Sequence, residues 1–291
     1  MTVAVIGGLN MDLAVHVPRL PAPGQTVTGS EALRSPGGKG GNQAVAAARL
    51  GARARMVGMV GDDPFGAELR RNLIAEGVDV TGVGTASGTA TGMALIVVQA
   101  DGENTITLSP GANAVPPPFE IGAADVLLMN LEVPLGAVVA AAQSTDALRV
   151  LNAAPFPDTG LSDLLRHVDV LVVNETEASA LLAAPIHDPA DAAGSLLALG
   201  PHTAVLTLGA SGAVAASGEI TCVEKGFPTE AIDAVGAGDA FCAALAVALG
   251  SGVPIAPALR RACAAGALAT TRPGAQSALP TNTEIARLLS R

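Results

Sequence analysis

The stretch Val168-Asp169-Val170-Leu171-Val172-Val173-Asn174-Glu175-Thr176-Glu177 indicates the fold class of this chain. A short apolar run ends in polar residues that open a helical pattern over residues 175–182. Such apolar runs recur, at residues 3–6, 55–60, 126–130, 148–151, 168–173 and 204–208. Further helical patterns lie at residues 41–50, 66–75, 135–142, 188–198, 238–249 and 256–270. Because continuous Val, Leu and Ile runs alternate with helices, the sequence predicts an α/β fold with a mostly parallel sheet covered on both faces.

Two segments depart from this alternation of strands and helices, and they predict a small β-sheet that projects from the main body. Residues 13–36 contain an alternating run, a proline-rich region and a second short extended piece. Residues 89–109 predict a hairpin, whose strands 93–99 and 105–108 flank the turn Ala100-Asp101-Gly102-Glu103. No linker or low-complexity tract divides the sequence, so we expect a single domain over residues 1–291, with the small sheet as a lid.

The composition excludes several classes of protein. The 291 residues include 16 Lys and Arg against 26 Asp and Glu, with no Trp, no Tyr and only five Phe. Nucleic-acid binding depends on basic side chains and on aromatic stacking, and a polybasic membrane patch depends on the same positive charges. Both kinds of side chain are scarce here. The sequence therefore predicts no nucleic-acid partner, no membrane binding and no sugar site built on aromatic rings.

Targeting signals and cysteine usage indicate the compartment. The longest apolar stretches, such as residues 240–249, are shorter than the roughly 18 residues that a membrane-spanning helix needs. The start Met1-Thr2-Val3-Ala4-Val5-Ile6 lacks the basic region of a signal peptide and is typical of a first core strand. Three well-separated cysteines, Cys222, Cys242 and Cys263, fit neither a disulfide framework nor a zinc site. We expect a cytoplasmic protein.

The strongest chemical motif is Asp233-Ala234-Val235-Gly236-Ala237-Gly238-Asp239, which opens a helical run. Gly236, Ala237 and Gly238 leave backbone N–H groups bare at a helix N-terminus, where partial positive charge favours a phosphate. Asp239 follows in the first turn, so its carboxylate is placed to accept a proton from a substrate hydroxyl beside that anion site. The structural alternative is that Asp239 caps the helix and the glycines form a turn.

Three further motifs carry polar groups that suit a ligand. Gly7-Gly8-Leu9-Asn10-Met11-Asp12 follows the first strand, at the end of the sheet where ligands bind, with an Asx turn as the alternative. Ser35-Pro36-Gly37-Gly38-Lys39-Gly40-Gly41-Asn42 suits close approach to a polar ligand, or forms a flexible turn. Asn174 and Glu177 lie one helical turn apart, where they suit Mg²⁺ bound to phosphates or simply cap the helix.

Together these motifs resemble the ribokinase-like, or PfkB, family of carbohydrate kinases. The resemblance runs nearly end to end, and the order and spacing of its pieces are highly specific although each piece alone is weak. It also rests on Pro23-Gly24-Gln25-Thr26-Val27, Gly61-Asp62-Asp63-Pro64-Phe65-Gly66 and Thr271-Arg272-Pro273-Gly274-Ala275-Gln276. The resemblance implies a Rossmann-like, mostly parallel sheet flanked by helices, a projecting β-lid, and a homodimer formed through the lids of two subunits.

By matching motif, the resemblance implies an ATP-dependent sugar kinase and assigns roles to residues. Asp239 is expected to be the catalytic base, with the amides of Gly236, Ala237 and Gly238 as the anion hole for the transferred phosphoryl group. The residues expected to bind the sugar are Asn10, Asp12, Gly38, Lys39, Asn42, Glu132 and Asp239. Those expected to contact ATP are Asn174, Thr207, Gly209, Ala210, Gly212, Gly238 and Cys263, with Glu177 positioning Mg²⁺ directly or through water.

The resemblance also implies activation by a monovalent cation, usually K⁺. The matching positions act mostly through backbone carbonyls, and they are Asp233, Val235, Ala269, Arg272, Gly274 and Ala278. The chain departs from the family pattern in three places. Ala278 stands where a Ser hydroxyl often completes the cation shell, and Ala234 replaces the usual Thr. Cys263 lies where a His or Asn often approaches the adenine, which makes the expected nucleotide pocket more apolar.

The expected reaction is phosphorylation of D-ribose at its primary 5-hydroxyl to give D-ribose 5-phosphate. Other small substrates of the same family, namely 2-deoxyribose, fructose and adenosine, are the alternatives. Residues 13–34 contain no Phe, Tyr or Trp to surround a nucleobase, which favours a bare sugar. A non-catalytic sugar- or nucleotide-binding regulator is the alternative from another class of protein, and the intact Asp239 argues against it.

Overall fold

The computed structural model describes residues 1–99, 103–117, 121–157 and 160–290. A nine-stranded sheet runs through its centre. The strands are β1 (Thr2–Ile6), β4 (Arg53–Gly61), β5 (Asp79–Ala86), β8 (Val126–Met129), β9 (Leu148–Asn152), β10 (Val170–Asn174), β11 (Thr203–Thr207), β12 (Gly212–Ser217) and β13 (Ile220–Lys225). Their order is β13-β12-β11-β10-β9-β8-β1-β4-β5. Strand β12 pairs antiparallel with both β11 and β13, and the other pairs of described strands in this sheet are parallel. The predicted mostly parallel sheet is confirmed.

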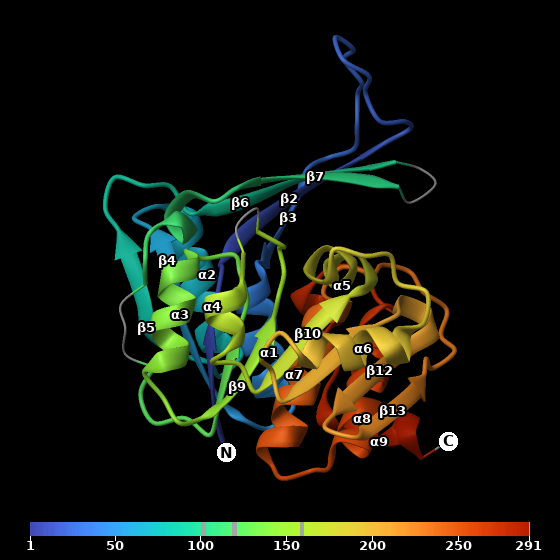
Figure 1. Cartoon of the computed structure of the whole chain (residues 1–291). Helices are drawn as coiled ribbons and strands as arrows, with labels where there is room; N and C mark the ends of the chain where they lie inside the picture. Colours follow the sequence, from blue (N-terminus) through green and yellow to red (C-terminus); the bar gives the residue numbers. More distant parts are fainter. Residues whose placement is uncertain (100–102, 118–120, 158–159, 291) are drawn as a thin grey trace.

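Helices cover both faces of this sheet (Figure 1). They are α1 (Lys39–Arg49), α2 (Pro64–Ala75), α3 (Leu135–Gln143), α4 (Ser162–Leu165), α5 (Glu175–Leu182), α6 (Pro189–Leu197), α7 (Ala237–Gly250), α8 (Ile255–Ala269) and α9 (Asn282–Leu289). Alternate residues of β1 pack into different cores, because successive side chains of a strand point to opposite faces. Val3 and Val5 join the core that contains α1, α7 and α8, whereas Ala4 and Ile6 join the core that contains α3 and α6.

Alanine-rich packing brings two helix N-termini to the same place. In α7, nine residues are buried, among them Ala240, Ala243 and Ala244. Small side chains allow close approach, and α7 packs against both α8 and α1. The first turns of α1 and α7 meet, because Asn42 and Gln43 of α1 hydrogen-bond to Asp239 of α7. This packing positions Lys39, Asn42 and Asp239 relative to one another.

A second, four-stranded sheet lies across one end of the molecule, while the chain termini lie at the other end (Figure 1). It contains β2 (Asn10–Val17), β3 (Leu33–Gly37), β6 (Gly92–Gln99) and β7 (Asn104–Ser109), in the order β3-β2-β6-β7. We call it the small sheet. The predicted hairpin is present as the antiparallel pair β6 and β7, and residues 100–102 of its predicted turn lie outside the described residues. The strands β2 and β3 reach Asn10 and Gly37, so the small sheet extends into the glycine-rich motifs.

The sequence patterns missed the strands β5, β12 and β13 and the helices α4 and α9. The strands β5 and β13 each have a neighbour on one side only, so they carry no continuous apolar run, and Ile220 and Val223 of β13 are exposed. In α9 only Ile285 is buried. Within the described ranges, no helix combines the length and apolar character needed to cross a membrane.

Candidate active site

Polar residues follow the parallel strands at one edge of the central sheet. Asn152 is the last residue of β9, and Asn174 and Thr207 end β10 and β11. Asn174 and Thr207 are register partners, so they lie side by side. Gly7 and Asn130 follow β1 and β8, whose last residues are also paired. This edge is where open α/β sheets bind their ligands.

Asp239 lies at the centre of this edge and is buried, with 5% of its surface exposed. Its Oδ2 accepts a hydrogen bond from Asn42 Nδ2 at 2.8 Å, and its Oδ1 accepts one from Gln43 Nε2 at 3.0 Å. Both donors come from the first turns of α1, nearly 200 residues away in sequence. The N-cap of α7 is Gly236, not Asp239. The carboxylate is therefore held by side chains and does not cap its own helix.

The turn before Asp239 leaves a bare helix end. Gly236 has φ 78°, a left-handed conformation that glycine adopts without strain. A Cβ atom on Gly238 would meet nothing within 4 Å, so the space beside this amide is open. Within the described part of the chain, the N–H groups of Gly236 and Gly238 donate to no other group. The Ala237 N–H donates to the Ala234 carbonyl at 3.2 Å, so this member of the predicted anion hole is engaged in the turn.

The predicted sugar-binding residues gather around the same carboxylate. Asn10 and Asp12 project from the start of β2 and are 4% and 9% exposed. Asn10 Oδ1 accepts a hydrogen bond from Asn113 Nδ2 at 2.7 Å. The backbone N–H of Lys39, directly after Gly38, donates to Glu132 Oε2 at 2.7 Å. The structure thus brings two predicted amide side chains, one lysine and three acids together from β2, α1, α7 and the loop after β8.

The charges in this cluster shift the pKa values of its members. Burial, together with the negative charges of Glu132 and Asp239, raises the pKa of Asp12 to about 7. Burial also raises the pKa of Glu132 to about 7, against the opposing influence of Lys39. The carboxylate of Asp239 raises the pKa of Lys39, so the ammonium stays charged. At neutral pH, Asp12 and Glu132 are able both to donate and to accept hydrogen bonds.

Four buried amide side chains near the site were missed by the sequence analysis, namely Gln43, Asn113, Asn130 and Asn152. Gln43 directly follows the motif that ends at Asn42, Asn130 ends the predicted strand 126–130, and Asn152 directly follows the predicted strand 148–151, so their positions were available as signals. Asn113 lies in a 3₁₀ turn, Gly111–Ala114, and no pattern pointed to it. Its side chain accepts from the Leu9 N–H at 2.9 Å and donates to the Leu9 carbonyl at 3.1 Å.

The predicted nucleotide residues line the neighbouring part of the edge. Asn174 and Glu177 form a capping box at the start of α5, with Asn174 Oδ1 accepting at 2.8 Å and Glu177 Oε2 accepting at 2.9 Å. Burial raises the pKa of Glu177. Thr207 Oγ1 donates to the Val173 carbonyl at 3.3 Å. Gly209 and Ala210 are exposed in the turn after β11, Gly212 follows in β12, and Cys263 is buried on α8.

Two loops predicted to hold a monovalent cation are joined to each other. Asp233 Oδ1 accepts from the Val235 N–H at 2.9 Å, and its Oδ2 accepts from the Gly274 N–H at 2.8 Å. The Arg272 guanidinium pairs with Glu284 at 3.2 Å. Ala269 and Ala278 are fully buried, and only their backbone carbonyls could serve as ligands. The donor set is therefore mostly carbonyl oxygen, which suits a hard cation.

Comparison with known proteins gives a consistent result. A model of the pfkB family of carbohydrate kinases matches residues 1–282. The chain belongs to the pfkB family of carbohydrate kinases. It is 38% identical over 302 aligned positions to a ribokinase of Haemophilus influenzae, covering 99% of this chain and 98% of that protein. It is 39% identical to a ribokinase of Bacillus subtilis, covering 99% of each.

The fold comparison agrees. The structure of Arabidopsis thaliana ribokinase complexed with ribose and ATP is similar with a TM-score of 0.91 and 29% identity, covering 100% of this chain and 99% of that chain. Membership of the pfkB family confirms the resemblance drawn from the motifs. The fold class is confirmed as well, including the smaller separate sheet.

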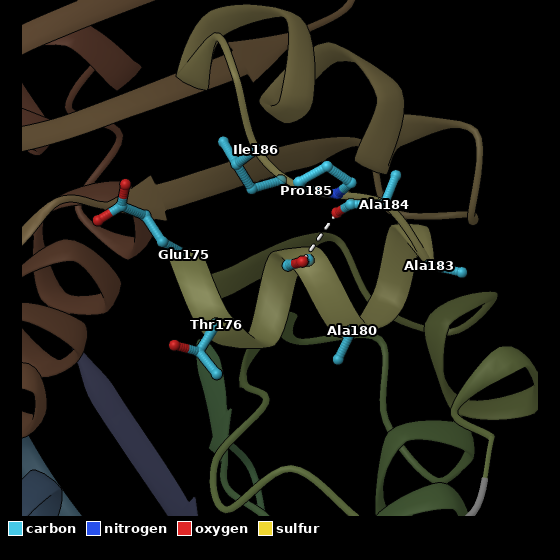
Figure 2. A pocket seen from close by; sticks show the side chains of 8 residues that line it. Glu175, Thr176, Ala180, Ala183, Ala184, Pro185 and Ile186 are labelled. Atoms are coloured by element: carbon cyan, nitrogen blue, oxygen red, sulfur yellow. Dashed lines mark hydrogen bonds between the residues drawn. The ribbon is translucent and has the colours of Figure 1, made fainter.

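A surface hollow of about 740 Å³ lies beside α5 (Figure 2). Its lining residues differ from the residues that gather around Asp239. Glu175 and Thr176 line it at the start of the helix, and Pro185 and Ile186 line it from the segment that follows. Ser179 Oγ donates to the Ala184 carbonyl at 2.8 Å and holds that segment against the helix. The hollow is not lined by Asp239 or by any residue predicted to bind sugar or ATP.

Proposed function

We propose that this chain phosphorylates D-ribose at its primary 5-hydroxyl with ATP, giving D-ribose 5-phosphate and ADP. The observation that carries the proposal is a buried, doubly hydrogen-bonded Asp239 directly beside the free amides of a helix N-terminus. That pair supplies a proton acceptor and an anion site within one helical turn. The ribokinases reported above, one of them named with ribose and ATP, support the choice of substrate.

In the proposed reaction, the side chains around Asp239 hold the sugar by hydrogen bonds. These residues are Asn10, Asp12, Gly38, Lys39, Asn42 and Glu132. Asp239 accepts the proton of the 5-hydroxyl while the oxygen of that hydroxyl forms a bond to the γ-phosphorus of ATP. The bond between the γ-phosphorus and the oxygen that bridges it to the β-phosphate breaks, and ADP leaves. The amides of Gly236 and Gly238 stabilise the negative charge of the transferred group, and Ala237 joins them on giving up its turn bond.

ATP is proposed to lie over the carboxyl ends of β10 and β11, beside Asn174, Thr207, Gly209, Ala210, Gly212 and Cys263. Among the described residues, no group of three or more His, Cys, Asp or Glu side chains gathers to hold a metal. The capping box engages Oε2 of Glu177, which leaves Oε1 as the oxygen for Mg²⁺. The phosphates would therefore supply most of the Mg²⁺ ligands, with Glu177 acting directly or through water. When bound, Mg²⁺ would neutralise phosphate charge.

A monovalent cation, K⁺, is proposed to bind between the two loops joined by Asp233. The carbonyl-rich donor set supports it, although Ala278 offers no hydroxyl. We expect turnover to rise when K⁺ replaces Na⁺ at constant ionic strength. Equal turnover in the two salts would contradict the proposed site.

We also propose that the protein is a cytoplasmic homodimer joined through the small sheet. Leu33, Ala14, Ile96 and Ile106 are register partners across its four strands, so their side chains share one face. Leu33 and Ile106 on this face are 57% and 52% exposed, and Leu108 is 46% exposed. A second copy would cover this apolar row. Sedimentation should give a dimer for the wild type and a monomer for Ile106→Asp, and a monomeric wild type would overturn the proposed assembly.

The substrate is tested by ADP release with ribose, 2-deoxyribose, fructose and adenosine. We expect the highest kcat/KM with ribose. Faster turnover of adenosine would identify a nucleoside kinase, and faster turnover of 2-deoxyribose or fructose would identify another sugar kinase of the family. Binding of ribose without turnover of any of the four substrates would favour a non-catalytic regulator.

A further inference from the structure

Gln43 is fully buried and lies directly behind Asp239, where it reaches no solvent and none of the space proposed for substrates. Its Nε2 donates to Asp239 Oδ1 at 3.0 Å and to Asn152 Oδ1 at 3.2 Å. Its Oε1 accepts from Asn130 Nδ2 at 3.2 Å. Both hydrogens and one lone pair of this amide are therefore used, and the neighbour Asn42 takes the other oxygen of Asp239.

Two backbone N–H groups fix which way these amides point. Asn130 Oδ1 accepts from the N–H groups of Gly8 at 3.4 Å and Glu132 at 3.3 Å. A backbone N–H only donates, so the oxygen of Asn130 must face these two groups. Its NH₂ group then faces Gln43, which requires the Gln43 oxygen on that side and the Gln43 NH₂ group toward Asp239.

Glycine makes room for this chain of hydrogen bonds. A Cβ atom on Gly7 would collide with the Asn130 amide, and one on Gly8 would collide with the Glu132 side chain. The Gly7-Gly8 pair after β1 therefore admits the side chains of the loop after β8. The side chains that approach this pair belong to the protein itself.

From this geometry we infer that Gln43 is a positioning residue for the proposed reaction. The backbone N–H groups of Gly8 and Glu132 orient the Asn130 amide, and Asn130 in turn orients the amide of Gln43. Gln43 thereby presents its NH₂ group to Oδ1 of Asp239. Asn42 and Gln43 together fix the plane of the carboxylate, so that the oxygen facing the sugar meets the 5-hydroxyl in line with its proton. The inference rests on the proposed function, because it assigns Asp239 as the base.

The first test is Gln43→Met, which keeps the length of the side chain and removes its hydrogen bonds. A misplaced base lowers the rate without weakening binding, so we expect kcat to fall about ten- to a hundredfold. KM for ribose and ATP should change less than about threefold, because Gln43 contacts neither. Gln143→Met, at an exposed position whose side chain hydrogen-bonds to His167, is the matched control and should keep wild-type kcat.

The second test is Gln43→Glu, which keeps the acceptor for Asn130 and serves if the methionine variant fails to fold. The new carboxyl donates to Asp239 only while it carries a proton. We expect the ratio of variant to wild-type kcat to fall as pH rises, which a loss of packing alone would not produce. A ratio that is independent of pH, or a folded Gln43→Met with wild-type kcat, overturns the inference. A wild type without ribose-dependent ADP release instead overturns the proposed function.

Discussion

The two halves of the candidate site are built differently. Around Asp239, the sugar half consists of buried side chains, including Asn10, Asp12 and Asn42, each less than a tenth exposed. Asn10 and Asn42 bond to other buried side chains, Asn113 and Asp239. At the ends of β10 and β11, the nucleotide half consists of exposed turns, and its polar side chains bond back to nearby backbone. Asn174 caps α5, and Thr207 bonds to the Val173 carbonyl.

This difference indicates two modes of recognition. The sugar half is fixed before any ligand arrives, so each side chain there is expected to matter individually. The nucleotide half offers mainly backbone groups and glycine turns, which suit phosphates at helix ends. Substitutions should therefore have large effects in the first half and small effects in the second.

Asp239→Asn provides the largest expected effect. The amide cannot take the proton of the 5-hydroxyl, and general bases contribute about 10²- to 10⁴-fold to enzymatic rates. We expect kcat to fall by about that factor. Steady-state ADP release measures the rate, and calorimetry with ribose should show that the sugar still binds.

The matched control for this variant is Asp163→Asn. Asp163 is exposed on α4, where it pairs with Arg166, so the same substitution should leave kcat unchanged. If Asp239→Asn retains wild-type turnover, Asp239 is not the base, and the sugar half loses its central role.

Asp12→Asn tests the energetic cost of a prearranged sugar half. The pKa of Asp12 is about 7 in the folded chain and near its ordinary value of 3.8 when unfolded. As pH rises through this window, the unfolded chain loses a proton that the folded chain retains, so the wild type loses stability. The variant cannot ionise and escapes this loss. The free energy of unfolding of the variant should equal that of the wild type near pH 4. Above pH 7 it should exceed that of the wild type by at most about 4 kcal/mol.

Denaturant unfolding of the two ligand-free proteins across this pH range measures the difference in free energy. The same variant should bind ribose more weakly, because a sugar hydroxyl loses a carboxylate acceptor. A stability difference that is constant with pH would show that Asp12 is not held in a destabilising environment.

The sequence predicted the centre of the fold better than its edges. Central strands such as β1 and β10 are buried on both faces, so nearly every residue in them is apolar and the sequence shows a continuous apolar run. The edge strand β5 contains glycine and threonine, because half of its surface needs no apolar side chain. Periodicity alone therefore could not separate β5 or β13 from loops.

The same contrast applies to the candidate site. Motifs with glycine or a charged residue at a helix start pointed to Asp239, Lys39 and Asn42, and the structure brings these residues together. The motifs could not show that Gln43 and Asn130 meet, since a neutral amide has no distinctive spacing. Their pairing depends on how α1 packs beside the end of β8, which a single sequence does not reveal.

Thr207→Val gives the smallest expected effect and tests the nucleotide half directly. The substitution removes one hydroxyl whose bond to the Val173 carbonyl is long, at 3.3 Å, and the backbone of the turn stays in place. A single neutral hydrogen bond contributes about 0.5–1.5 kcal/mol, so KM for ATP should rise about two- to tenfold with kcat nearly unchanged. Initial rates at saturating ribose over a range of ATP concentrations measure both constants. A loss of kcat as large as that of Asp239→Asn would show that the nucleotide half also depends on a fixed side chain, and the contrast between the halves would not hold.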